Sequence, residues 1–306
     1  MQNERRFLYR SHTHTIINIT KGETLFMSYA DKLFKQMCQD ILTTGTDTRG
    51  EIVRPHWEDG TAAYTIKKFG VINRYDLRKE FPALTLRKTA LKSCMDEILW
   101  IYQRKSNNIH DLKPKIWNEW ADENGEIGTC YGAVIRDPFI FKGELIDQTD
   151  YVLKQLKETP YSRRILTNLY QFKTLHSGNL DPCCYGTNFN VTCENGQLVL
   201  NMVLNQRSQD VLAANNWNVC QYAILLMMFA QVSNMIPGEL VHVIADAHIY
   251  DRHVPVIQEL IQREEYPAPI VTLNPEIKNF YDFTTDDLFV ENYKAGEQIK
   301  NIPIAI

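Results

Sequence analysis

The feature that most constrains the fold is a stretch that is apolar on nearly every side. In a helix over residues 218–232 the apolar members would point in all directions: Tyr222, Ile224, Leu225, Leu226, Met227, Met228 and Phe229. A surface helix carries one apolar stripe, whereas a helix that is apolar all round must be covered on every side. The chain has 306 residues, of which 44% are hydrophobic, so it can build a sizeable core. We therefore predict a buried helix at 218–232.

The remaining pattern mixes helices and strands without a regular β-α-β alternation. Apolar residues at helical spacing predict helices at 25–44, 88–103, 147–158 and 252–263. Runs rich in β-branched and aromatic residues predict strands at 51–55, 61–75 and 239–245, with the last strands after Pro267 and Pro269. The dipeptide Asn195-Gly196 predicts the turn of a hairpin over 189–204. This mixture indicates a single α+β domain at 26–306, preceded by an extension at 1–25.

Bulk composition argues against several classes of protein. The net charge is −4 and the basic residues are dispersed, so a nucleic-acid partner is not expected. The seven cysteines include no CxxC pair, the N-terminus lacks a signal-peptide pattern, and no apolar run reaches the ~18 residues of a membrane span. His248 and His253 have no thiol pair at metal-ligand spacing, so we expect no metal. We expect a cytoplasmic protein with free thiols and no membrane segment.

The strongest chemical motif joins a doubled thiol to a downstream arginine and amide. Cys183 and Cys184 follow Pro182, and the segment QRSQD begins at position 206 and is followed by Asn218. A thiolate is a strong nucleophile, and an arginine beside it lowers its pKa and can also clamp an anion. The alternative is that both cysteines are ordinary small core residues.

This motif and several others resemble thymidylate synthase. The family joins a Pro-Cys nucleophile to a downstream Gln-Arg-Ser-x-Asp and to an Asn eleven residues after that Arg, the spacing of Arg207 and Asn218. Other matches follow in family order: DEILW (96–100), IWNEWADENG (116–125), YG (131–132), SRR (162–164), DAHIY (246–250) and PIAI (303–306). The resemblance implies one domain around a large bent mixed sheet flanked by helices, which works as a homodimer.

The reaction that the resemblance implies is reductive methylation of dUMP to dTMP, with 5,10-methylenetetrahydrofolate as co-substrate. Addition of a thiolate to C6 of uracil makes C5 nucleophilic, and Cys183 takes this role because it follows Pro182. Cys184 stands where many members carry His and is expected either to fill the core or to support the site. Glu97, on a mostly apolar helix face, would organise water and move protons near the pyrimidine carbonyl. Tyr131 would assist removal of the C5 proton.

The resemblance also assigns the nucleotide site. Arg54, Arg207 and Ser208 would bind the phosphate, with Gln206 in the same motif, and Arg163 and Arg164 would come from the partner subunit. Taken alone, tandem arginines are more often simply solvated. Asn218 would read N3–H and O4 of uracil, which excludes cytosine. His248 and Tyr250 would bind the 3′-hydroxyl, the alternative for His248 being a satisfied core histidine.

For the folate, the resemblance implies stacking surfaces and one acceptor. The stacking residues would be Ile116, Trp117, Trp120, Leu180 and Trp217. Asp210 would accept from the pterin and is also assigned to the catalytic set, and Ala305 and Ile306 would close over the ligand. Four departures from the family stand out: Asn118 at a common Asp, Ala214 at a usual Gly, Trp217 at a usual Phe and Ala245 at a usual Gly. The hairpin after Cys183 is also four residues longer than in many members.

Three other functions are weighed against the synthase. A pyrimidine nucleotide 5-hydroxymethylase of the same family would quench the folate adduct with water instead of hydride. A non-catalytic nucleotide- or RNA-binding homologue would have no need for Cys183, Glu97 and Tyr131 together. A thiol hydrolase would need a histidine partner motif after Cys183, and none is recognisable. The set of site residues therefore argues against a non-catalytic homologue, whereas the altered loop at 214–217 is compatible with the hydroxymethylase, and the synthase is the main prediction.

Overall fold

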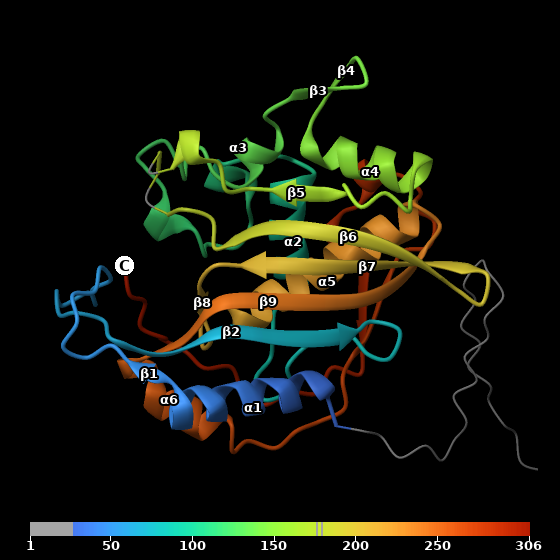
Figure 1. Ribbon diagram of the computed structural model, residues 1–306. Coiled ribbons are helices and arrows are strands. Elements are labelled where there is room, and N and C mark those ends of the chain that lie inside the picture. Colours follow the sequence, from blue (N-terminus) through green and yellow to red (C-terminus); the bar gives the residue numbers. More distant parts are fainter. Residues whose placement is uncertain (1–26, 176, 179) are drawn as a thin grey trace, which may run out of the picture.

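The apolar segment forms α5, Asn215–Val232, at the centre of the molecule (Figure 1). The computed structural model describes residues 27–175, 177–178 and 180–306. Helix α5 packs against α2, Leu91–Tyr102, and against the main sheet. Tyr102 and Phe189 both meet the Phe229 ring edge to face, at 6.4 and 5.5 Å between centroids. The prediction of a buried helix is confirmed, and the helix begins three residues earlier than expected.

One large sheet carries the fold, and its neighbouring strands run in both directions. Its seven strands follow the order β1-β2-β9-β7-β6-β5, with β8 paired to β9. Strand β9 is parallel to β7 and β8, whereas the other neighbours are antiparallel. The strands are β1 Thr46–Asp47, β2 Thr65–Asp76, β5 Leu166–Asn168, β6 Cys184–Glu194, β7 Gln197–Gln206, β8 Gln209–Asp210 and β9 Ile236–Tyr250. The predicted α+β class with a large mixed sheet is therefore confirmed.

The other helices and two small hairpins surround this sheet. Figure 1 shows α2 and α5 behind the sheet, α1 and α6 beside its β1–β2 edge and α4 beside β5. These helices are α1 Tyr29–Thr44, α3 Gly132–Ile135, α4 Gln148–Glu158 and α6 Val254–Leu260. The small hairpins are β3 Phe139–Phe141 with β4 Glu144–Ile146, and β10 Ile270–Leu273 with β11 Leu288–Glu291. Short 3-10 helices are Ile109–Asp111, Asn118–Trp120, Phe172–Thr174, Asp251–His253, Phe280–Asp282 and Thr285–Asp287.

Several predicted boundaries need correction. The strand predicted at 51–55 is wrong: the segment is a loop in which Ile52 is fully exposed, and only His56 makes an isolated bridge to Ala62. A short run of residues that favour strands forms no strand unless another segment pairs with it. Pro55 in addition lacks the backbone N–H that would donate a ladder hydrogen bond. Helix α1 begins at Tyr29, and residues 1–26 lie outside the described residues. The strand predicted at 239–245 extends to 236–250, and the helix predicted at 252–263 is a 3-10 turn followed by α6.

The β6–β7 hairpin brings the sequence motif together. Asn195 and Gly196 form its turn with φ of 51° and 80°, the left-handed conformation that an Asn-Gly pair tolerates best. From this turn the register runs back to the pair Cys184 and Gln206. The Arg207 N–H then donates to the Cys183 carbonyl at 3.0 Å. Residues that are 24 apart in sequence therefore lie side by side at the open end of the hairpin.

Candidate active site

The arginine of the motif lies beside the thiol, as predicted. Arg207 Nη2 is 3.8 Å from Cys183 Sγ. The guanidinium is held by two carbonyls of the preceding loop, because Nε donates to Pro182 O at 2.9 Å and Nη2 to Asp181 O at 2.8 Å. A planar guanidinium fixed in this way keeps one edge close to the sulfur. The pair can therefore present a nucleophile and an anion-binding group to one ligand.

The surroundings of Cys183 act on its thiol in opposite directions. Burial raises the pKa of Cys183, while the positive charges of Arg207 and Arg54 lower it and Asp181 raises it further. The net pKa is above the usual value, so burial outweighs the arginines. The sequence analysis predicted the direction of the Arg207 effect and not the larger effect of burial. Arg54 is exposed on the 51–56 loop, and its positive charge still acts on Cys183.

The backbone conformation of Tyr131 directs its side chain to Cys183. Its hydroxyl accepts the Cys183 N–H at 3.0 Å, and its ring lies 5.2 Å from the Trp117 ring. The residue has φ of 46°, an uncommon conformation for a bulky side chain. Next to it, a Cβ on Gly132 would lie 2.2 Å from the Ser106 carbonyl. This close packing positions the hydroxyl directly beside Cys183.

Glu97 is a buried carboxyl held between two indoles. It lies in the middle of α2 and is only 4% exposed. Its Oε1 accepts from Trp117 Nε1 at 2.9 Å and its Oε2 from Trp217 Nε1 at 2.6 Å. Burial raises the pKa of Glu97 to about 7, although both indole bonds favour the ionised form. A carboxyl that titrates near neutral pH can both accept and donate a proton.

A network of side-chain amides begins at the end of the hairpin. Gln206 donates to Asn218 Oδ1 at 3.3 Å, and Asn218 donates to Gln221 Oε1 at 3.1 Å. Cys184, which is buried, and His242 both contact Gln206 Oε1, at 3.2 and 2.8 Å. Cys184 thus belongs to the core and also contacts a predicted site residue.

Asp210 lies at the end of β8 and carries a second group of contacts. Its Oδ1 accepts from the backbone N–H groups of Leu212 and Ala213, both at 3.0 Å. His253 Nδ1 lies 3.4 Å from the same oxygen. Burial would raise the pKa of Asp210, but His253 and the backbone donors lower it below the usual value. The carboxylate is therefore ionised at neutral pH and can accept further hydrogen bonds.

His248 and Tyr250 lie next to each other on β9. Their rings are 5.1 Å apart and nearly perpendicular. His248 is 7% exposed, and its Nδ1 lies 2.9 Å from Asp246 Oδ1. The orientation of this ring is thus set by a carboxylate, a geometry that agrees both with the predicted sugar contact and with the alternative of a satisfied core histidine.

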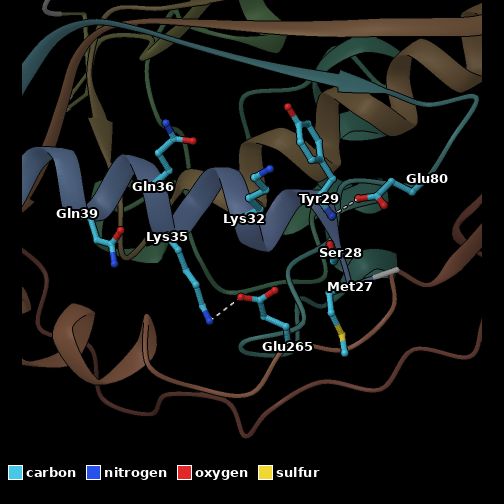
Figure 2. Close-up of a pocket in the computed structure, with 9 residues that line it drawn as sticks. All are labelled: Met27, Ser28, Tyr29, Lys32, Lys35, Gln36, Gln39, Glu80 and Glu265. Atoms are coloured by element: carbon cyan, nitrogen blue, oxygen red, sulfur yellow. Dashed lines mark hydrogen bonds and ion pairs between the residues drawn. The ribbon is translucent and has the colours of Figure 1, made fainter. Parts of the chain in front are cut away.

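The predicted folate and interface residues are more dispersed. Trp117 is buried, Ile116 is 39% exposed, and Trp120, Leu180 and Trp217 are partly buried. Ile306 pairs through its backbone with His56, at 2.8 and 3.0 Å. Arg163 and Arg164, between α4 and β5, are both exposed. A separate surface hollow beside α1, which includes Tyr29, Glu80 and the Lys35–Glu265 ion pair, contains none of the predicted site residues (Figure 2).

Comparisons with known proteins establish the family of this chain. A family model described as thymidylate synthase matches residues 32–305. Thymidylate synthase 1 of Bacillus subtilis (strain 168) is 39% identical over 278 residues, which cover 89% of this chain and 98% of that protein. The chain belongs to the thymidylate synthase family. The thymidylate synthase of Clostridium beijerinckii is 38% identical over 279 residues, 90% of this chain and 98% of the relative. The solved structure of thermostable thymidylate synthase A from Bacillus subtilis has a TM-score of 0.83 at 37% identity, over 90% of this chain and 99% of that one.

Membership of the thymidylate synthase family confirms the predicted family, fold class and methyltransferase activity. Within residues 27–175, 177–178 and 180–306, no helix is long and apolar enough to span a membrane. Three residues at the site were missed by sequence reasoning: Gln221, His242 and His253. Gln221 lies one turn of helix after Asn218, a spacing that could have indicated a contact. The two histidines carried no recognisable signal, because their partners lie far from them in the sequence.

Proposed function

We propose that this chain converts dUMP to dTMP with 5,10-methylenetetrahydrofolate, through a covalent adduct of Cys183 at C6 of uracil. The observation that carries the proposal is the group formed by Cys183, Arg207 and Tyr131, with Glu97 and its two indoles nearby. The names of the relatives support the same reaction. A pyrimidine 5-hydroxymethylase would need the same nucleophile, but neither relative is named as one.

In the proposed mechanism, Arg207 and Arg54 assist the nucleophile. Both lower the pKa of the Cys183 thiol, against the effect of burial. The same guanidinium groups, with Ser208, would bind the phosphate of dUMP. A thiolate added to C6 moves electron density to C5, which then forms the new carbon–carbon bond. Binding of the nucleotide and activation of the thiol thus use the same cations.

Glu97 and Tyr131 would handle the protons. The pKa of Glu97 is about 7, so the carboxyl can exchange a proton with water beside the pyrimidine carbonyl at neutral pH. Tyr131 accepts from the Cys183 N–H, and its own O–H stays available to orient water near C5 when that carbon loses its proton. Burial keeps the pKa of Tyr131 well above its usual value, so it acts as a neutral hydrogen-bonding group.

Nucleotide selection would come from Asn218, His248 and Tyr250. Asn218 retains one N–H and one oxygen lone pair beyond its bonds to Gln206 and Gln221, as the uracil edge requires. His248 and Tyr250 would bind the 3′-hydroxyl of the sugar. Gln206 would act through Asn218 and not on the nucleotide directly.

The folate would bind against the indoles beside Glu97 and on Asp210. When bound, it supplies the one-carbon unit and the hydride. Trp117 and Trp217 offer aromatic surface for a flat pterin, with Ile116, Trp120 and Leu180 around them. The ionised Asp210 is the acceptor that a pterin N–H edge needs. Ala305 and Ile306 lie on the C-terminal segment, which would cover the ligand.

We also propose that the protein is a cytoplasmic homodimer in which Arg163 and Arg164 complete the partner's phosphate site. Both arginines are exposed, so they are available to another subunit. Strand β2 also leaves Phe69 and Ile72 90% and 58% exposed, an apolar surface that a second sheet could cover. No metal takes part in the proposed chemistry.

The deciding experiment is hydrogen release from C5-labelled dUMP in the presence of methylenetetrahydrofolate, with mass analysis of the product. Stoichiometric release with formation of dTMP supports the proposal. Release with formation of 5-hydroxymethyl-dUMP would assign the hydroxymethylase instead. Tight binding of dUMP and folate without any release would assign a non-catalytic homologue.

A further inference from the structure

The orientation of the Asn218 amide decides which base it can read, and this inference rests on the proposed role of Asn218. An amide turned over about χ2 exchanges its oxygen and nitrogen at nearly the same positions. In one orientation it pairs with N3–H and O4 of uracil. In the other it pairs with N3 and the 4-amino group of cytosine. Whatever holds this amide therefore determines the base.

A backbone carbonyl sets the polarity of the amide network. The Gln206 side-chain amide contacts Ser208 O at 2.9 Å. A carbonyl cannot donate, so the atom that faces it must be the amide nitrogen, Nε2. The same nitrogen donates to Asn218 Oδ1 at 3.3 Å, and Asn218 Nδ2 then donates to Gln221 Oε1. The orientation of Asn218 therefore follows from that of Gln206.

The other end of the Gln206 amide is held by two donors. Its Oε1 lies 2.8 Å from His242 Nε2 and 3.2 Å from the Cys184 sulfur. His242 is fully buried on β9, and burial lowers its pKa to about 3, so the ring is neutral. Its Nδ1 has no hydrogen-bond partner among the described residues. A proton there would be a buried unpaired donor, so the proton belongs on Nε2 and is donated to Gln206.

We propose that His242 is a positioning residue for base selection: its Nε2–H, with the Cys184 thiol, holds Gln206 in the orientation that makes Asn218 read uracil and reject cytosine. His242 does not touch the nucleotide in this scheme. It acts through Gln206, whose other end is fixed by Ser208. If the Gln206 amide turned over, its oxygen would face Asn218, and Asn218 would have to turn over in order to donate to it. Loss of the contact at either end of the Gln206 amide would therefore favour the opposite orientation of Asn218.

The test measures dissociation constants for dUMP and dCMP without folate, so that it does not depend on turnover. Gln206→Glu removes the N–H groups that face Ser208 O and Asn218, so Asn218 must donate to the new carboxylate and turn over. The ratio that favours dUMP should fall roughly tenfold or more. His242→Met removes the donor at similar volume and should lower the ratio severalfold. His242→Gln places an N–H at the same reach as Nε2 and should keep the ratio near that of the wild type.

Asn218→Asp serves as the reference, because it changes the base-reading group itself. If this variant shifts the ratio while Gln206→Glu and His242→Met do not, the role of His242 is wrong and base reading by Asn218 stands. If His242→Met and His242→Gln lower the preference for dUMP equally, the proposed role of His242 is also wrong, because the hydrogen-bond donor kept in His242→Gln would then not be what sets the preference. If Asn218→Asp leaves the ratio unchanged, Asn218 does not read the base. The proposed base-reading role of Asn218 and the proposed positioning role of His242 are then both wrong. Thermal unfolding of each variant checks that the fold is intact.

Discussion

His253 connects the Asp210 carboxylate to the C-terminal segment through the two nitrogens of one ring. Nδ1 lies 3.4 Å from Asp210 Oδ1, and Nε2 lies 2.8 Å from the carbonyl oxygen of Pro303. Since the carbonyl can only accept, Nε2 carries a proton, and a second proton on Nδ1 would face the carboxylate. The protonated ring therefore donates to the Pro303 carbonyl and places its positive charge beside the Asp210 carboxylate, although Nδ1 makes no hydrogen bond within the described part of the chain.

The first prediction is a dependence of stability on pH that arises from this pair. Burial lowers the pKa of His253, but Asp210 and the Pro303 carbonyl raise it above the usual value on balance. A raised histidine pKa stabilises the folded state below the unfolded pKa, about 6.5, and this contribution is lost as pH rises through the folded value. The lowered pKa of Asp210 has the opposite pH dependence: its contribution to the stability of the folded state is present at neutral pH and is lost as pH falls through the folded pKa of Asp210.

Urea unfolding of wild type and His253→Gln at pH 5.5 and pH 8.5 measures this effect. The variant should be destabilised more at pH 5.5, where the wild-type ring is charged. Asp210→Asn should remove most of the pH dependence assigned to His253. An equal difference between wild type and variant at both pH values would contradict the prediction.

The second prediction separates the two adjacent cysteines. Cys183→Ser should lower turnover by several orders of magnitude, because an alkoxide forms far less readily than a thiolate. Cys184→Ser should keep a substantial fraction, since a hydroxyl can replace the thiol as a donor to Gln206. Steady-state rates of dTMP formation measure both. Comparable losses would show that the roles are misassigned.

The third prediction concerns the subunits. Arg163→Ala and Cys183→Ala proteins should each be inactive alone. After mixing and subunit exchange, activity should return, because one site of each mixed dimer has both an intact Cys183 and an intact Arg163. Native mass spectrometry with an isotopically labelled variant verifies the exchange. Exchange without recovered activity would show that the arginines serve their own subunit.

The fourth prediction uses the raised pKa of Glu97. Because its folded pKa is about 7 against an ordinary 4.5, the folded state binds this proton more tightly than the unfolded state. Stability from this group is therefore present at low pH and is lost between about pH 4.5 and 7, by up to roughly 3 kcal/mol. Glu97→Gln should gain stability relative to wild type from pH 4.5 to pH 8 and should lose most of its turnover. A constant stability difference across this range would show that Glu97 does not titrate there.

Sequence reasoning succeeded where the signal was local. The apolar residues of α5 and the Asn195-Gly196 turn depend on near neighbours, and both predictions hold. The strand predicted at 51–55 failed because strand formation requires a partner that the segment does not have. Composition of a short run says nothing about which other segment lies beside it.

The same distinction applies to the site. Cys183, Arg207 and Asn218 could be identified because the family motif places them at fixed spacings. His242 could not, because its contact with Gln206 depends on the parallel pairing of β7 and β9, whose strands are joined through α5. His253 and Pro303 are 50 residues apart in the chain, and only the docked C-terminal segment brings them together. The predicted lowering of the Cys183 pKa missed the burial that opposes it, since burial is a property of the assembled fold.

The turn at Asn195 and Gly196 has a consequence for how proteins of this shape can diverge. Cys183 and Arg207 sit at the open end of the β6–β7 hairpin, far from its tip, and side chains along each strand alternate between the two faces. Lengthening both strands by two residues preserves that alternation, whereas an odd insertion in one strand reverses every face beyond it. The sequence predicts a hairpin four residues longer than in many members of the family, and that number would fit such a symmetric extension. The β6–β7 hairpin can therefore change in length by two residues per strand during evolution, while Cys183 and Arg207 at its open end keep their relative positions.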